Sequence, residues 1–245
     1  MVDVGGGAFL RFGEARAKFE DLDHIAISHF HTDHSADFVT LLKTGNFTER
    51  TRPLGVSGPA GGGPFPSLTD FLTSNVGKDG AYQYLSGYID GTGGLVRLEP
   101  VELDPSGDVV QAVRFMTDRD ITITATGVPH GIVPAIAYRV RVGDTEIVFA
   151  SDQNGNDERF IDFAKDVDVL VMHLVAPEGI EGSFRALHAP PGRIGEIASA
   201  AGAGKLVLSH LTRWSLPGLD ENLAAVRNHY DGDIVLAEDL MCVSP

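Results

Sequence analysis

Cysteine is nearly absent from this sequence, since Cys242 is the only one among 245 residues. No disulfide can form within the chain, which permits a reducing compartment without requiring one. The length fits one large domain or two small ones and is sufficient to bury a sizeable core.

Long hydrophobic runs are also lacking. No stretch approaches the roughly 20 apolar residues of a membrane helix, so the sequence predicts neither a membrane span nor a membrane partner. No basic region followed by an apolar one opens the chain, so no signal peptide is visible. Residues 1–4 already have the pattern of a strand end, and Gly5, Gly6 and Gly7 follow at once. We therefore expect that one or two leading strands, and any export signal, are missing; the sequence as written predicts a cytoplasmic protein, and the compartment stays open.

Basic residues are few in comparison with acidic ones. The 19 Lys and Arg residues stand against 34 Asp and Glu residues, which gives a net charge of −15. A surface of this sign repels phosphate backbones, whereas nucleic-acid-binding proteins usually carry a basic face. The charge therefore predicts that no nucleic acid is a partner.

Short apolar segments, several of them rich in β-branched residues, recur along the chain, and each ends just before a polar residue that can bind a metal. Runs of this kind, bounded by Gly, Asp or Pro, predict largely buried strands. The segments are His24–Ser28 before His29, Ile121–Ala125 before His130, Thr145–Ala150 before Asp152, Val167–Met172 before His173, and Lys205–Leu208 before His210.

Helical patterns alternate with these strands, which predicts an α/β fold in which helices cover sheet faces. Apolar spacing predicts helices over Ser35–Lys43, Pro191–Ala201 and Leu219–Tyr230, and a hairpin turning at Gly143-Asp144. The stretch Arg52–Leu103 is rich in Gly and Pro, with one helix predicted over Leu68–Tyr84. We interpret it as an excursion over the site, within one domain that spans residues 1–245.

The densest group of candidate ligands is the stretch His29-Phe30-His31-Thr32-Asp33-His34. His29 and His31 are two residues apart, so both imidazoles point the same way in an extended segment. Three imidazoles and a carboxylate suit borderline divalent metals such as zinc. Burying four such groups without partners would cost several kcal/mol, which argues against an ordinary core.

With this H-x-H-x-D-H signature the chain resembles the metallo-β-lactamase superfamily, from Val2 to Leu211. The resemblance implies a four-layer αββα sandwich, here without its first strand or strands. It also implies a dinuclear metal site, in which His29, His31 and His130 bind one metal, Asp33, His34 and His210 bind the second, and Asp152 bridges both. Zinc is the expected metal, with manganese or iron as alternatives. A metal-bridged hydroxide would attack the substrate, and Asp33 would orient it or accept its proton.

His188, in Leu187-His188-Ala189-Pro190, resembles a histidine of the ribonuclease Z and arylsulfatase-like branch that assists the leaving group. The strand before it ends His173-Leu174, however, where ribonuclease Z has a glutamate after the histidine. The role of His173 stays open, and His24 and His229 are given no site role. The basic arm with which ribonuclease Z holds tRNA is not evident.

These features predict a metal-dependent hydrolase of small phosphodiesters or aryl sulfate esters, with His188 and Asp33 as catalytic residues. A lactonase or other acyl hydrolase with the same ligands is the alternative. A tRNA 3′-processing endonuclease and a non-catalytic metal-binding protein are disfavoured. The branch resemblance also predicts a homodimer.

Overall fold

A computed structural model describes the whole chain, residues 1–245, and divides it into two compact units. The first unit comprises Met1–Asp104 and Val113–Arg119, and the second comprises Pro105–Ala112 and Asp120–Pro245. Each unit has its own buried hydrophobic cluster. None of the helices combines the length and the apolar character that crossing a membrane requires.

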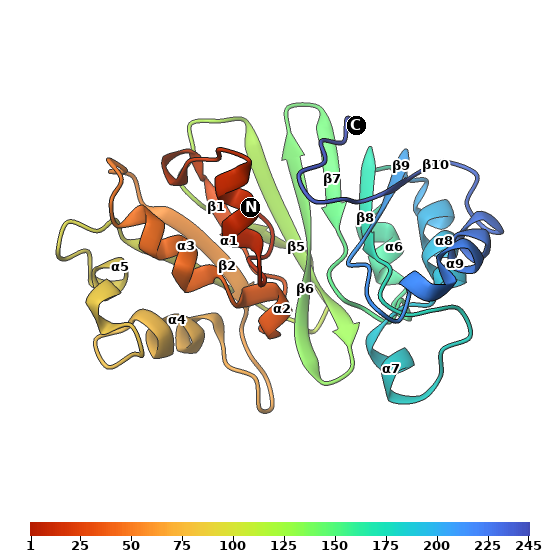
Figure 1. The fold of residues 1–245 in the computed structure, drawn as a ribbon, viewed down its shortest axis with the longest axis horizontal. Coiled ribbons are helices and arrows are strands. Elements are labelled where there is room, and N and C mark those ends of the chain that lie inside the picture. The colour runs from red at the N-terminus through yellow and green to blue at the C-terminus, as the bar shows by residue number, and fades with distance from the viewer. The chain divides into compact units, whose positions relative to one another are not determined.

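The first unit is built on a small parallel sheet with the strand order β1-β2-β3. The strands are β1 (His24–Ala26), β2 (Leu54–Pro59) and β3 (Leu98–Leu103). Side chains from β1 and β2 bury completely against the helices, as the zero exposure of Ile25 and Val56 indicates. The helical segments are α1 (Ala8–Glu14), η1 (Phe19–Asp21), α2 (Thr32–Ser35), α3 (Phe38–Gly45), α4 (Leu68–Val76), η2 (Gln83–Leu85) and α5 (Gly87–Asp90) (Figure 1).

The helix predicted over Ser35–Lys43 is divided in the structure. It forms α2 and α3, with a break at Ala36 and Asp37. The break has a backbone cause, because the amide of Asp37 donates to the carbonyl of Val4 at 2.9 Å, and the amide of Val4 donates to the carbonyl of His34 at 2.8 Å. The N-terminal segment thus inserts its own hydrogen bonds where a continuous helix would have made internal ones.

The second unit carries a mixed sheet with the order β10-β9-β8-β7-β6-β5-β4. Strands β7 to β10 are parallel, whereas β5, β6 and β7 pair antiparallel. The bounds are β4 (Gln111–Val113), β5 (Ile121–His130), β6 (Val133–Val142), β7 (Thr145–Phe149), β8 (Val169–His173), β9 (Lys205–Ser209) and β10 (Asp233–Leu236). The hairpin predicted around Gly143 is the β6–β7 pair.

Strand β5 is longer than the sequence predicts, because it continues through the Gly-Val-Pro stretch to His130. Gly127 permits this, since a Cβ there would lie 2.1 Å from the carbonyl oxygen of Pro105. Pro129 pairs with Pro134 of β6 without breaking the register. His130 is therefore the last residue of a strand rather than part of a loop.

Helices complete the second unit (Figure 1). Its buried cluster unites side chains of the sheet with those of α6, α8 and α9. Ile194, Ile197 and Ala198 of α8 are fully or almost fully buried in this cluster. The predicted helix Pro191–Ala201 is confirmed with the same bounds. The helical segments are α6 (Arg159–Phe163), α7 (Gly182–Leu187), α8 (Pro191–Ala201), η3 (Leu216–Gly218) and α9 (Leu219–Arg227).

The Gly- and Pro-rich stretch Arg52–Leu103 contains more regular structure than its composition indicates. It begins with β2 and ends with β3, two neighbouring strands of the first sheet. The helix predicted within it is α4, which ends at Val76 and starts with a capping box between Ser67 and Asp70. That the stretch covers the site stays a prediction.

His24 is a structural residue of the first unit. It is 3% exposed, its Nε2 lies 2.8 Å from Ser57 Oγ, and its ring lies 4.7 Å from that of Phe115. Burial lowers the pKa of His24 to about 3, and the charged N-terminus contributes in the same direction. The imidazole is therefore neutral in the folded protein at any pH well above 3.

This burial predicts a defined acid sensitivity. The folded-state pKa lies below the unfolded value of 6.5, so unfolding takes up a proton and stability is lost as the pH falls below 6.5. Between pH 7 and pH 5 the His24 contribution to the free energy of unfolding falls by about 2 kcal/mol. His24→Gln, measured by urea unfolding at both pH values, should remove that part of the decrease.

His229→Gln is the matched control, because His229 is exposed after α9. In this variant the free energy of unfolding should differ between pH 7 and pH 5 by the same amount as in the unchanged protein. An equal pH dependence in the His24→Gln variant would contradict the role given to His24.

Candidate functional site

The carboxyl ends of four strands place the candidate residues of the second unit at one edge of its sheet. Parallel strands end on the same side of a sheet, and β5 runs in the same direction as β7 because both are antiparallel to β6. The residues at these ends are His130 of β5, Asp152 after β7, His173 of β8 and His210 after β9.

Asp152 is the centre of this group and is 2% exposed. Its Oδ2 lies 3.8 Å from each of three imidazole nitrogens, His130 Nε2, His188 Nδ1 and His210 Nε2. Its Oδ1 lies 2.6 Å from His173 Nδ1. One buried carboxylate thus faces four imidazoles, which form two groups able to hold a metal ion: Asp152 with His130 and His188, and Asp152 with His173 and His210.

His188 lies between α7 and α8 and is 8% exposed. Burial lowers its pKa to about 4; the Asp152 carboxylate opposes this shift, and the neighbouring imidazoles reinforce it. At neutral pH the ring is therefore uncharged, and it can donate one hydrogen bond and accept another.

The segment that carries His188 is held by several hydrogen bonds. The carbonyl of Leu187 lies 2.8 Å from His130 Nδ1. Arg185 donates to the carbonyl of Asn154 at 2.7 Å and to Asn156 Oδ1 at 3.0 Å. Asn154 Nδ2 donates back to the carbonyl of Ala186 at 3.0 Å. Helix α7 is thus fixed to the loop that follows Asp152, and its position determines that of His188.

His173, whose role the sequence left open, belongs to the group through its contact with Asp152. Leu174, which stands where the branch has a glutamate, is fully buried in the core of the unit. Its amide donates to the carbonyl of Ser209 at 2.8 Å. The leucine therefore has a packing role, and His173 is the polar group that β8 supplies.

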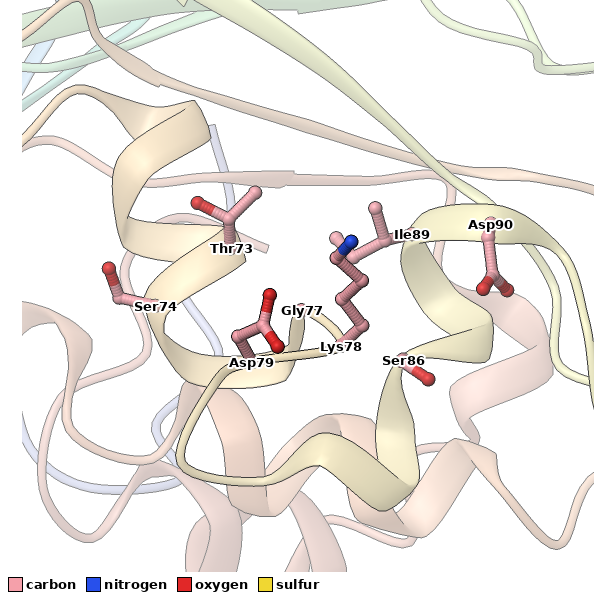
Figure 2. Close-up of a pocket in the computed structure, with 8 residues that line it drawn as sticks. All are labelled: Thr73, Ser74, Gly77, Lys78, Asp79, Ser86, Ile89 and Asp90. Carbon is pink, nitrogen blue, oxygen red and sulfur yellow. The ribbon is translucent and has the colours of Figure 1, made fainter.

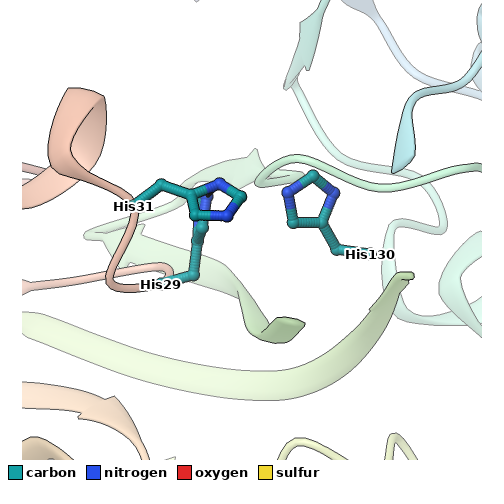
Figure 3. A group of neighbouring side chains, drawn as sticks. All are labelled: His29, His31 and His130. Carbon is teal, nitrogen blue, oxygen red and sulfur yellow. Dashed lines mark hydrogen bonds between the residues drawn. The ribbon is translucent and has the colours of Figure 1, made fainter. Parts of the chain in front are cut away.

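In the first unit the candidate residues lie after β1. His29 and His31 face each other, with 3.0 Å between His29 Nε2 and His31 Nδ1 (Figure 3). The ring centroid of His34 lies 4.0 Å from that of His29. Asp33, whose side chain is 61% exposed, has its Oδ2 4.0 Å from His34 Nε2. The four residues predicted from the signature are therefore brought together.

Asp3 is a site residue whose role the sequence did not reveal. Its Oδ1 accepts the amide of Ser28 at 2.6 Å, and its Oδ2 accepts the Ser28 hydroxyl at 2.8 Å. The same Oδ2 lies 2.8 Å from His34 Nδ1. Gly5 passes so near the motif that a Cβ would lie 1.8 Å from the carbonyl oxygen of Asp33. The strand-like segment before three glycines was the available signal, but it indicates only a turn.

Backbone strain accompanies the site residues. Asp3, Ser151 and His210 have φ values of 52°, 61° and 56°, in the left-handed region that side chains with a Cβ rarely adopt. Such conformations cost about 1–3 kcal/mol each and persist where the surrounding structure fixes them. His210 is itself a candidate ligand, Ser151 directly precedes Asp152, and Asp3 contacts His34.

A separate cavity of about 530 Å³ lies in the first unit, between the end of α4 and α5 (Figure 2). It contains none of the candidate metal ligands and is therefore distinct from the site. Its lining residues are Thr73, Ser74, Gly77, Lys78, Asp79, Ser86, Ile89 and Asp90.

Comparison with known proteins gives the family. A model of the beta-lactamase superfamily domain matches residues 3–211. Ribonuclease Z of Methanosarcina acetivorans is 26% identical over 270 residues, covering 98% of this chain and 87% of that protein. The metallo-beta-lactamase fold protein YhfI of Bacillus subtilis is 27% identical over 240 residues, covering 97% of this chain and 84% of YhfI.

Solved structures have the same fold. The crystal structure of YhfI superposes with a TM-score of 0.72 and 21% identity, over 97% of this chain and 83% of that one. Human tRNase Z, short form, superposes with a TM-score of 0.71 and 18% identity, over 99% of this chain and 86% of that one. These matches confirm the α/β sandwich predicted from the signature.

The prediction that nucleic acid is not a partner is wrong, because relatives that align over nearly the whole chain are ribonucleases. The error has a physical cause. A net charge sums over the entire surface, whereas phosphate binding depends on the local potential, in which bound divalent cations are the largest charges.

The chain belongs to the metallo-β-lactamase superfamily, in its ribonuclease Z branch, and is a metal-dependent hydrolase.

Proposed function

We propose that this hydrolase cleaves phosphodiester bonds and uses two divalent cations to do so. The observation that carries the proposal is Asp152, one buried carboxylate that follows β7 and faces four imidazoles, three of them from the carboxyl ends of strands and the fourth, His188, from the junction of α7 and α8. The ribonuclease Z relatives add support, since a ribonuclease acts on phosphodiester bonds. An RNA phosphodiester is therefore the first substrate class to test.

Three of the candidate histidines each have an oxygen beside their Nδ1 nitrogen. His34 is held through Nδ1 by Asp3, His130 through Nδ1 by the carbonyl of Leu187, and His29 through Nδ1 by the Ser28 hydroxyl at 3.0 Å. A histidine that binds metal through one nitrogen is typically oriented by an oxygen at the other. This donor set suits zinc, and manganese and iron are alternatives.

The ligand assignment follows the family signature. One cation would be held by His29, His31 and His130, the second by Asp33, His34 and His210, with Asp152 shared between them. When bound, the cations supply a hydroxide nucleophile near neutral pH and stabilise the negative charge that develops on the phosphoryl group. Asp33, the more exposed of the two carboxylates, orients the nucleophile or accepts its proton.

His188 acts on the departing group in this proposal. Its neutral ring lies beside Asp152, and it donates a hydrogen bond to the oxygen on which charge develops as the ester bond breaks. His173 is a positioning residue, because its contact with Asp152 Oδ1 fixes the plane of that carboxylate.

A substrate panel on metal-loaded protein tests the proposed function. Bis(p-nitrophenyl) phosphate, a tRNA precursor, an aryl sulfate and a lactone would each be followed by steady-state kinetics. We expect the protein to hydrolyse the two phosphodiesters. A chelator that removes the metal should abolish this activity, and added zinc or manganese should restore it. Turnover of the lactone or the sulfate alone would overturn the assignment to phosphodiesters.

His188→Ala tests the leaving-group role. With a ribonucleotide leaving group, which departs as a poorly stabilised alkoxide, we expect kcat to fall by about 10²–10³. With p-nitrophenolate, which needs no help to depart, the decrease should be within about tenfold. Equal losses for both leaving groups would show that His188 does not act on the departing oxygen.

Asp3→Asn tests the contact between the Asp3 carboxylate and His34. Replacing one carboxylate oxygen by an amide removes an acceptor shared by Ser28 and His34, so metal affinity should fall by about 10–100-fold in a chelator competition titration. Asp37→Asn is the matched control, because the Asp37 carboxylate accepts the amides of Gly7 and Phe9 at the start of α1. Equal metal affinity in both variants would contradict the role of Asp3.

A further inference from the structure

A continuous series of rings leads from the candidate ligands of the second unit to its surface. The ring centroids of His130 and His188 are 5.3 Å apart, and those of His188 and Phe184 are 4.8 Å apart. Phe184 of α7 lies 6.0 Å from Trp214, which follows β9. These separations are typical of aromatic pairs in contact. Trp214 is therefore the outer end of a series that begins at a candidate metal ligand.

Trp214 is 54% exposed although it is the largest apolar side chain of its loop. The guanidinium of Arg213 lies over its ring, with 4.7 Å between Arg213 Cζ and the ring centroid. An exposed indole beside a cation offers both a flat apolar face and a positive charge.

The loop that presents Trp214 is rigidly fixed. The amide of Trp214 donates to Thr212 Oγ1 at 3.1 Å, and that hydroxyl donates to the carbonyl of Val175 at 2.9 Å. The buried Ser215 closes the turn by accepting the amide of Thr212 at 3.0 Å, and the buried Asn222 donates to the carbonyl of Ser215 at 2.9 Å. The exposure of Trp214 is thus imposed by its surroundings rather than by a loose loop.

We propose that Trp214, with Phe184 and Arg213, forms a stacking site for a nucleobase of the substrate. The inference deepens the proposed function, on which it rests, by naming the group that flanks the scissile phosphodiester. Bases stack on aromatic side chains in a sequence-tolerant way, and an arginine beside the ring adds a cation–π contribution. The ring series would place that base next to His188, which donates a hydrogen bond to the leaving oxygen in the proposed function.

The site can be tested by binding, without catalysis. Trp214 is the only tryptophan of the chain, so its intrinsic fluorescence reports this location alone. AMP should quench the emission saturably, whereas ribose 5-phosphate, which has the same phosphate and no base, should not. Equal effects of the two compounds, or no effect of either, would overturn the stacking site.

Phe184→Leu should weaken AMP binding about five- to tenfold, because Trp214 loses the ring against which it packs. Phe47→Leu is the matched control, since Phe47 is an exposed aromatic beside a cation, with Lys43 Nζ 4.2 Å from its ring centroid, in the first unit. It should leave the AMP affinity unchanged. Equal weakening by both substitutions would contradict the proposal.

Kinetics with Trp214→Ala separate this site from the proposed function. KM should rise about tenfold or more for the dinucleotide ApA, whose departing oxygen belongs to a nucleoside, and stay unchanged for methyl p-nitrophenyl phosphate, which carries no base. Quenching by AMP without hydrolysis of either ester would support the stacking site and reject the phosphodiesterase. Hydrolysis of both esters with equal KM changes, and no quenching by AMP, would reject the stacking site and support the phosphodiesterase.

Discussion

The first unit depends on the carboxylate of Asp3, which joins the N-terminal segment to the histidine motif. One oxygen accepts the amide of Ser28, and the other serves both the Ser28 hydroxyl and His34. The neighbouring backbone completes the connection, because Val4 bonds to His34 and Gly5 passes directly against Asp33. A segment of three residues thus fixes both ends of a loop that carries four polar side chains.

In the second unit the candidate residues are brought together by the shared direction of the strands, whereas in the first unit Asp3 holds them together. His130, Asp152, His173 and His210 come from parts of the chain far apart in sequence. They meet because β5, β7, β8 and β9 all run the same way and end at one edge. The core beneath these strands is almost entirely apolar, so a polar group can be placed only where a strand leaves it.

Sequence reasoning succeeded where local pattern and topology coincide. The alternation of buried strands and polar ends predicted β7, β8 and β9, and the signature predicted the grouping of His29, His31, Asp33 and His34. It failed where the deciding partner is distant. The break after α2 results from a hydrogen bond of Val4, the length of β5 from its pairing with β6, and the role of Asp3 from a histidine 31 residues later. The exclusion of nucleic acid failed because net charge carries no information on location.

The left-handed backbone at Ser151 and His210 has a consequence for protein engineering. Glycine is the residue that such a conformation favours, so a search for stabilising substitutions would select glycine at both positions. At His210 that choice would delete a candidate ligand. At Ser151 it would increase the freedom of the backbone that directly precedes Asp152 and orients it. Thermostability and activity should therefore oppose each other at these two positions, and consensus or stability-guided redesign of this chain should hold both fixed.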